Sequence, residues 1–509
     1  MPEHAAPSDE ASSARPSSAG APASASRRFA FVLVLFLVSG ATGLLYEVAF
    51  SKLLSNVFGA TAYAVSTVLA AFMGGLALGA HLGGRNAGRT TRPLVAYGAL
   101  EIGVGALCVV SPLVLSAVTD AYVVLARALP GSLVLVTAVR AALAAACVVA
   151  PTVAMGATLP LLSRVVAGTA EGGSGRRLAL LYGTNTLGGA TGALVSAYVI
   201  LPELGVRGTM HAAALANVTI GVLAIVAGRR GASPPGGAEA ASGRPFDGIE
   251  TRVDEPPSIR AAKAAPTPEL AAPASVVERL ALGLAFASGL LVFAAEVVET
   301  HLLALLIGNS AYAFGLMLAV FLVCLAVGAA RAPGLSRKHG AAALSLGLGL
   351  SALGVAATLP LWDTLPLLFA AAGKVVQGWA GREATRAFAA LAILAVPTVF
   401  LGTTFPLLLE RIAERTDVAS AVGRLTVVNT VGTIAGSILT GYFVLPALGS
   451  QRTLVLVAVV LAVLAAVAAR ILVAPAGRRR LFALAVAGCV VALLVPRWDL
   501  ARLTSGANV

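Results

Sequence analysis

The stretch SGATGLLYEVAFSKLLSNVFGATAYAVSTVLAAFMGGLALG, residues 39–79, occurs twice in the chain. Residues 288–328, SGLLVFAAEVVETHLLALLIGNSAYAFGLMLAVFLVCLAVG, match it without a gap, with 16 identities in 41 positions. A second block, APTVAMGATLPLL ending at Leu162, returns as VPTVFLGTTFPLL ending at Leu408. The chain is therefore predicted to contain two related halves.

The composition excludes a soluble globular protein. Of the 509 residues, 58% are hydrophobic and only 12% are charged, which leaves too little charged surface for a water-soluble domain. The net charge of +13 does not indicate nucleic-acid binding, because the arginines lie in short clusters between apolar runs, where they set membrane orientation. The four cysteines lie in apolar runs without metal-ligand spacing, so we predict no disulfide, metal site or cofactor.

The apolar runs predict the number of membrane spans. At about 20 apolar residues per span, the first half gives helices near 29–54, 61–83, 94–116, 132–163, 178–201 and 208–228. The second half gives the same number, near 279–304, 310–330, 341–370, 384–409, 419–446 and 452–472. An even number of spans in each half makes the two repeats parallel rather than inverted. The predicted fold is an all-α polytopic membrane protein of two parallel six-helix repeats.

The remaining segments differ in composition. Residues 1–28, rich in Ala, Ser and Pro, are predicted to be a disordered tail, and residues 231–277 a flexible linker between the repeats 29–230 and 278–475. Residues 476–509 begin with the basic cluster 478–480, which the apolar run 481–495 and a short tail follow. Because this run is short for a span, it either crosses as a thirteenth helix or lies in the interface.

Basic residues predict the orientation. They cluster on alternate connections, on the same side as the amino terminus, and such loops stay in the cytoplasm. Lys374, Arg382 and Arg386 lie on the opposite side and weaken the pattern. The cytoplasmic clusters contain Arg85, Arg89, Arg92, Arg164, Arg176, Arg177, Arg229, Arg230, Arg331, Arg337, Lys338, Arg411, Arg415, Arg424, Arg478, Arg479 and Arg480.

Four charged residues recur at matching positions inside the apolar helices. Glu47 aligns with Glu296, and Arg140 aligns with Arg386. At about 1.5 Å per residue, the acid and the base of each half lie at similar depths, so they can meet. Charges in hydrocarbon are costly and mark function or pairing, so these residues are predicted to form a substrate-binding or gating site. The alternative is a neutral Glu–Arg clamp within each half.

Two acids have no counterpart in the other half. Glu299 lies one turn from Glu296, where the first half has Phe50, and it joins the predicted substrate site. Glu101 in the third helix would be protonated if it faced lipid, whereas facing the bundle it could relay protons or bind a cation. The surplus of acids over the two arginines suits an oligocationic amine.

Neutral residues also recur. Asn185 and Asn429, each followed by Thr and by small-xxx-small spacing, suit close helix packing with an interhelical hydrogen bond, and are secondary candidates for the site. Pro160 and Pro406 are predicted to kink the fourth and tenth helices near their cytoplasmic ends, where they could act as hinges. Two tyrosines at the outer boundary, where an aromatic belt is expected, are further secondary candidates: Tyr63 and Tyr312.

The chain resembles a known group of membrane proteins. Six plus six helices, a long central linker and the loop GGRNAGRTTRP (83–93) are similar to the major facilitator superfamily. Residues 39–80, PTVAMGATLPLLSR (151–164) and NTLGGATGALVSAYVILPELGVRGT (185–209) resemble the membrane portion of bacterial proteins in which such a bundle is fused to a spermidine synthase domain. The resemblance covers about 29–475.

This resemblance implies a bacterial inner-membrane protein linked to polyamines, with the first, fourth, seventh and tenth helices around a central cavity. An aminopropyltransferase would need a Rossmann-like domain with a Gly-rich motif and catalytic Asp residues, and none is visible. GGSGRR (172–177) connects two membrane helices, and MGGLALGA (73–80) lies inside one. We therefore assign no catalytic residue and lean against an enzyme, although the tail 498–509 resembles the lead-in to the fused domain.

Two functions follow as hypotheses. The first is a transporter of a polyamine or related small cationic amine. The second is a membrane platform for an aminopropyltransferase domain, fused or separate, without transport. The predicted partners are membrane lipid and the amine, and not nucleic acid.

Overall fold

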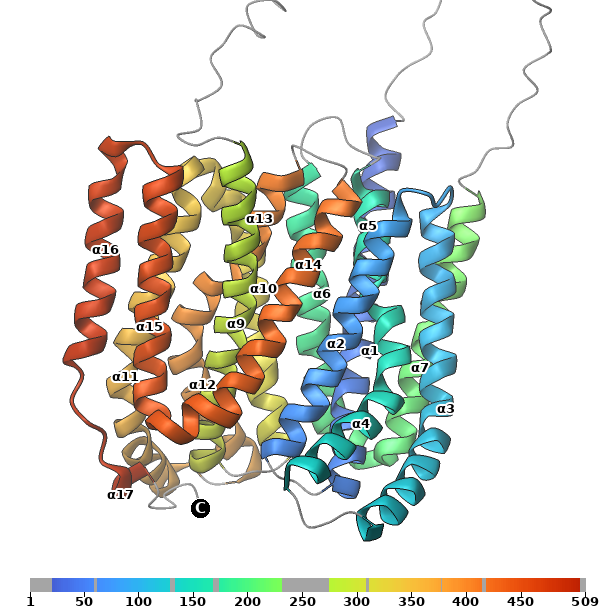
Figure 1. The fold of residues 1–509 in the computed structure, drawn as a ribbon, viewed down its shortest axis with the longest axis horizontal. Coiled ribbons are helices and arrows are strands. Elements are labelled where there is room, and N and C mark those ends of the chain that lie inside the picture. Colours follow the sequence, from blue (N-terminus) through green and yellow to red (C-terminus); the bar gives the residue numbers. More distant parts are fainter. Residues whose placement is uncertain are drawn as a thin grey trace, which may run out of the picture.

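The computed structural model describes residues 21–58, 62–128, 133–167, 174–230, 274–307, 311–376, 378–413 and 418–503. Every regular element in these ranges is a helix, which confirms the predicted all-α class. Eight segments of the described chain are long and apolar enough to cross a membrane, and the protein is therefore a multi-pass membrane protein. Figure 1 shows the helices of the first half (blue to green) and those of the second half (yellow to red) side by side in one bundle.

The helices of the two halves follow the same order. The first half contains α1 (Ala21–Phe58), α2 (Ala62–Ala87), α3 (Pro93–Ala128), α4 (Leu133–Gly156), α5 (Thr158–Ala167), α6 (Ser174–Val195), the π-helical segment η2 (Ser196–Ile200) and α7 (Leu201–Arg230). The second contains α9 (Ala274–Ile307), α10 (Ala311–His339), the 3-10 turn η3 (Gly340–Ala342), α11 (Ala343–Val375), α12 (Trp379–Gly402), α13 (Thr404–Ala413), α14 (Val418–Leu439), the π-helical segment η4 (Thr440–Val444) and α15 (Leu445–Leu472). They are followed by α16 (Pro475–Leu494) and α17 (Leu500–Leu503).

Two predicted segment boundaries need correction. Residues 21–28 were assigned to the tail, but they form the first turns of α1. Residues 274–277 were assigned to the linker, but they begin α9. Apolar runs mark only the part of a helix that lies in lipid, and Ala-rich flanks continue the helix beyond it because Ala has the best helix propensity. The rest of the predicted tail and linker, 1–20 and 231–273, lies outside the described residues.

The predicted fourth and tenth helices are each split in two. α4 ends at Gly156 and α12 ends at Gly402, four residues before Pro160 and Pro406 respectively. A proline ring clashes with the carbonyl group four residues earlier and offers no N–H group, so a straight helix cannot continue there. The breaks occur at matching places, while a hinge role of the two prolines stays a prediction.

Two other irregularities also occur in both halves. The π-helical segments η2 and η4 each precede a kinked helix. The kinks lie at Gly205, with φ 66°, and at Gly449, with φ 75°. Glycine adopts positive φ at little cost, which explains why the chain can turn at these two places. Matching irregularities in both halves support a common fold for the repeats.

Small residues hold neighbouring helices together in the same way in each half. A Cβ atom added to Gly188 or Gly192 of α6 would overlap carbonyl oxygens of α1. The equivalent glycines of α14, Gly432 and Gly436, stand in the same relation to α9. This is the close backbone approach that small-xxx-small spacing predicts.

The two halves meet along four helices. α2 packs against α14, and α6 packs against α10. Gly423 of α14 lies against the backbone of Gly84, and Gly183 of α6 lies against Ala329 of α10. These contacts place α1 and α9 near the centre of the molecule.

One end of the bundle is basic. The last turns of α2, α5, α7, α10 and α13 end on the side where α1 begins, at the top of Figure 1. We call this side the basic end and the other the opposite end. The basic residues in those last turns are Arg85, Arg164, Arg229, Arg230, Arg337, Lys338, His339 and Arg411.

The chain after α15 folds back along the second half. α16 packs against α11 and α15 and runs from the basic end to the opposite end (Figure 1). There the indole nitrogen Nε1 of Trp498 donates a hydrogen bond to the carbonyl oxygen of Leu359 at 2.9 Å, and Arg502 pairs with Asp363 at 3.5 Å. α16 is not among the eight segments that meet the length and hydropathy criteria for a span.

Candidate functional site

A cavity of about 280 Å³ lies between the two halves. α1, α2 and α6 form its wall on one side, and α9, α10 and α14 form the other. Among the described residues, those that the fourth and tenth predicted helices contribute lie near their breaks: Met155, Thr158, Leu401, Gly402 and Phe405. The first and seventh predicted helices, α1 and α9, line the cavity as expected. The helices α2, α6, α10 and α14, which were not expected in the wall, line it as well.

The residues around the cavity are paired by the internal repeat. Glu47 of α1 and Glu296 of α9 both line it, as do Asn185 of α6 and Asn429 of α14. The further pairs of lining residues are Ser39 with Ser288, Gly40 with Gly289, Phe72 with Phe321, and Leu76 with Leu325. The cavity therefore lies where equivalent surfaces of the two halves face each other.

Two carboxyl groups lie in the described part of the cavity wall. Glu47 lies close enough to Glu296 for their charges to interact. Among the described residues, no Lys, Arg or His lines the cavity. Two neighbouring acids in an environment of low polarity are stabilised by a bound cation or by protonation. The site is thus suited to a positively charged ligand.

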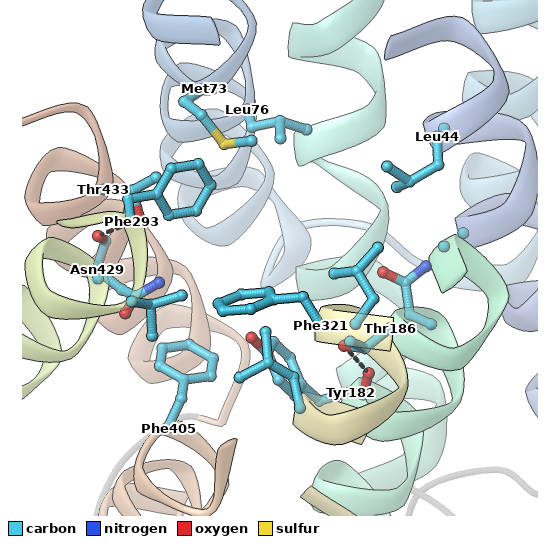
Figure 2. A pocket seen from close by; sticks show the side chains of 18 of the residues that line it. Leu44, Met73, Leu76, Tyr182, Thr186, Phe293, Phe321, Phe405, Asn429 and Thr433 are labelled. Atoms are coloured by element: carbon cyan, nitrogen blue, oxygen red, sulfur yellow. Dashed lines mark hydrogen bonds between the residues drawn. The ribbon is translucent and has the colours of Figure 1, made fainter. Parts of the chain in front are cut away.

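The rest of the wall is mainly apolar and aromatic. Figure 2 shows Phe321 reaching into the middle of the cavity, with Phe293 and Phe405 on the side of the second half. The rings of Tyr182 and Phe405 lie 5.0 Å apart and join the two halves at this level. Such a wall contacts the hydrocarbon part of a ligand, and aromatic faces also attract ammonium groups.

Polar groups of α6 and α14 complete the site. Asn185 lines the cavity and also donates a hydrogen bond from Nδ2 to the carbonyl oxygen of Phe36 in α1 at 3.2 Å, which is the predicted interhelical bond. Thr186 and Thr433 donate to carbonyl oxygens one turn earlier in their own helices, at Tyr182 and Asn429 (Figure 2). These side chains are held in place before any ligand arrives.

The predicted ion pair between Glu296 and Arg386 is not formed. Arg386 has one ion-pair partner among the described residues, Glu383, which lies one turn away on α12. Residues three apart on a helix are neighbours, so this local partner is available without bringing two helices together. Glu383 also accepts a hydrogen bond from the hydroxyl group of Tyr198 at 2.7 Å. Arg386 therefore belongs to a polar cluster outside the cavity wall.

This cluster connects the two halves at the opposite end. Tyr198 belongs to η2 of the first half, whereas Glu383, Trp379 and Tyr312 belong to the second. The ring centroids of Tyr198 and Tyr312 are 5.3 Å apart, and those of Tyr198 and Trp379 are 6.0 Å apart. The structure places Tyr312 in this aromatic contact rather than in the cavity wall.

Glu299 does not line the central cavity. Its side chain is buried, with 4% exposed, and borders a small space next to Glu296. The prediction of a direct amine contact at Glu299 is therefore replaced by a position one layer behind the cavity wall.

Glu101 faces the bundle, so the lipid-facing alternative is wrong. Its Oε1 accepts a hydrogen bond from Ser39 at 2.6 Å, and its Oε2 accepts one from Asn217 at 2.7 Å. Only 1% of the residue is exposed. Because Ser39 also lines the cavity, Glu101 is one hydrogen bond away from it.

Two predicted site residues cannot be placed. The side chains of Arg140, within α4, and of Tyr63, within α2, lie outside the described residues. Among the described part of the chain, no group of three or more His, Cys, Asp or Glu residues is arranged to hold a metal ion.

Sequence reasoning missed several residues of the site for two reasons. Ser39 and Phe72 are identical to their counterparts in the repeat, so the alignment contained the signal, but identity alone does not distinguish a cavity residue from one that packs helices together. Glu383 aligns with Thr137 of the first half, so a search for duplicated charges could not find it.

Comparison of the chain with protein-family models and with curated proteins found no match.

Proposed function

We propose that the protein is a major facilitator-like transporter that moves a polyamine or a related small cationic amine by alternating access. Two parallel six-helix repeats would form its two moving halves. The matching helix breaks, π-helical segments and glycine contacts of both halves support this architecture. Transporters with such repeats place the substrate site at the interface between the repeats, near the membrane midplane.

The proposed orientation follows from the basic end. Lys and Arg accumulate in cytoplasmic loops, so the basic end and the amino terminus are assigned to the cytoplasm of a bacterial inner membrane. Helix α16 has 20 residues, about 30 Å at 1.5 Å per residue, and is assigned as a thirteenth span that ends on the outer side.

The central cavity is the observation that carries the proposal. Glu47 and Glu296 provide two carboxyl groups in a mostly apolar and aromatic space, where a cationic ligand would favour their ionised form. A small alkyl amine matches both features, because its ammonium groups pair with carboxylates and its methylene groups contact hydrocarbon. An amine with two or more ammonium groups would satisfy both acids at once.

Transport into proteoliposomes tests the proposal. Vesicles containing the protein should accumulate labelled spermidine or putrescine, and Glu296→Gln should reduce uptake at least tenfold, since a buried charge-assisted contact is worth about 1.5–3 kcal/mol. Glu278→Gln is the matched control, because Glu278 lies on the same helix but pairs with Arg424 at the basic end. Uptake no greater than in protein-free vesicles would sink the proposal.

A second candidate function, a platform for an aminopropyltransferase domain, is favoured by the segment after α16. Gln451 donates a hydrogen bond from Nε2 to the carbonyl oxygen of Pro496 at 2.6 Å, and Trp498 packs on Trp362, with ring centroids 6.3 Å apart. A domain attached beyond this segment would be held close to the bundle. Its test is the formation of spermidine from putrescine and decarboxylated S-adenosylmethionine by membranes that contain the protein. A reading frame continuing past Val509 into a Gly-rich α/β domain would also favour it.

A further inference from the structure

A second and much smaller cavity adjoins the central one. Its volume is about 10 Å³, close to the space that one water molecule occupies. Glu296, Leu318 and Phe321 line both cavities, so the two share a wall. We call the small space the satellite cavity. Its other lining residues are Glu299, Thr300, Leu303, Met317 and Leu394.

Glu299 brings an unsatisfied polar atom to the satellite cavity. The side chain is 4% exposed, and its Oε2 has no hydrogen-bond partner among the described residues. An ionised carboxylate without a partner is costly in such a place, so the group is either neutral or paired with a cation. A proton on the carboxyl group or a bound cation would therefore stabilise Glu299 at this position.

The walls favour a proton over a metal cation. Hard metal cations are held by a shell of several oxygen ligands. Here only Glu296, Glu299 and Thr300 offer side-chain oxygens, and the remaining wall is hydrocarbon, aromatic ring and thioether. A proton needs a single oxygen, and two carboxyl groups that share a site of low polarity hold one proton between them because both cannot ionise cheaply.

We propose that Glu296 and Glu299 share one proton and that the transporter exchanges this proton for the amine. The inference rests on the proposed function. An ammonium group that reaches Glu296 from the central cavity supplies the positive charge that the proton had supplied. The proton then leaves to water, both groups become carboxylates, and the charge of the site is unchanged. Departure of the amine reverses the step, which makes the protein an amine–proton antiporter.

The groups around the pair fit this role. Glu47 of α1 lies near Glu296 across the boundary between the halves, so an empty site in which all three acids are ionised is disfavoured. The thiol group of Cys324 on α10 is a titratable group near Glu299. α12 contributes only Leu394 to the described lining. No described basic residue lines the satellite cavity, so nothing there replaces the proton except the ligand.

The first half has no equivalent pair. Phe50, which is 2% exposed, occupies the position that corresponds to Glu299. The antiporter would therefore carry one shared proton in its second half, and the two halves would differ in function despite their common fold.

The test measures proton release on ligand binding in detergent, with a pH-indicator dye and spermidine as the probe. The wild type should release roughly one proton for each spermidine bound, as linkage between the two ligands requires. In Glu299→Gln this ratio should fall close to zero, whereas Glu278→Gln on the same helix should keep the wild-type ratio. Spermidine binding without proton release in the wild type, or an unchanged ratio in Glu299→Gln, would overturn the inference. So would uptake that a sodium gradient drives and a proton gradient does not.

Infrared difference spectroscopy keeps the test independent of the proposed function. The wild-type protein without ligand should show the carbonyl band of a protonated carboxylic acid that Glu299→Gln lacks and Glu278→Gln retains. If the wild type binds no spermidine, the transport proposal fails. The carbonyl band would still show whether Glu299 holds a proton. Its presence in the wild type and loss in Glu299→Gln would support a proton held at Glu299, and identical spectra would refute it.

Discussion

Glu101 shows how a single buried carboxyl group can be satisfied without a basic partner. Ser39 of α1 and Asn217 of α7 each donate a hydrogen bond to it, so one side chain joins three helices of the first half. Oδ1 of Asn217 has no partner among the described residues. A rotation of that amide group would bring Oδ1 to Glu101, where it could accept a hydrogen bond from the O–H group of the neutral acid.

Substitutions of Glu101 should separate the hydrogen bonds from the charge. Glu101→Leu would leave the Ser39 hydroxyl and the Asn217 amide unpaired in a buried place, at a cost of about 1–3 kcal/mol for each group. Glu101→Gln can keep both contacts, because its amide can donate to Oδ1 of a rotated Asn217. Thermal unfolding in detergent should show a marked fall in Tm for Glu101→Leu and a small one for Glu101→Gln. Equal losses would mean that the charge itself stabilises the first half.

At the scale of helices, close packing depends on glycines at matching places. Gly192 and Gly436 lie against the backbones of α1 and α9, where no space exists for a methyl group. Gly192→Ala and Gly436→Ala should each lower the stability by about 1–3 kcal/mol, because the helices must move apart. Gly283→Ala on α9 is the control, since nothing lies within 4 Å of its added Cβ atom. Alanine there should be neutral or slightly stabilising, so an equal loss in all three variants would contradict the packing argument.

The helices also show how much of the fold the sequence could predict. Apolar runs located the helices, because burial in lipid requires about 20 apolar residues. They missed the ends: α3 was expected to stop near residue 116 but continues to Ala128, through the charged residues Asp120 and Arg127. Hydropathy identifies the apolar part of a helix and not the place where the helix ends. The pairing of Glu296 with Arg386 was predicted from their similar depth in the membrane, and depth alone could not reveal that Arg386 has a partner on its own helix. The paired acids at the cavity, in contrast, followed directly from the repeat.

For the whole molecule, the contacts between the halves lie on both sides of the cavity. Toward the basic end, Gly183 of α6 approaches Ala329 of α10. At the opposite end, Tyr198 binds Glu383 and packs on Trp379. In the alternating-access cycle proposed above, these two sets of contacts would separate in turn to admit and release the ligand.

A disulfide cross-link between the halves should therefore stop transport. The Cβ atom of Ala329 lies 3.2 Å from a Cβ atom built at Gly183, near the 3.5–4.5 Å range of disulfides. In a background in which Cys108, Cys147, Cys324 and Cys489 are replaced by alanine, oxidation of Gly183→Cys with Ala329→Cys should abolish spermidine uptake, and reduction should restore it.

The control is a cross-link of the same geometry within one half. A Cβ atom built at Gly488 of α16 lies 3.3 Å from that of Ala352 in α11. α16 and α11 pack together and would move as one unit, so oxidation of Gly488→Cys with Ala352→Cys should leave uptake unchanged. Loss of uptake in both pairs would show that oxidation harms the protein in general. Full uptake with the halves joined at Gly183 and Ala329 would mean that they do not separate at the basic end, and a rocking mechanism would be excluded.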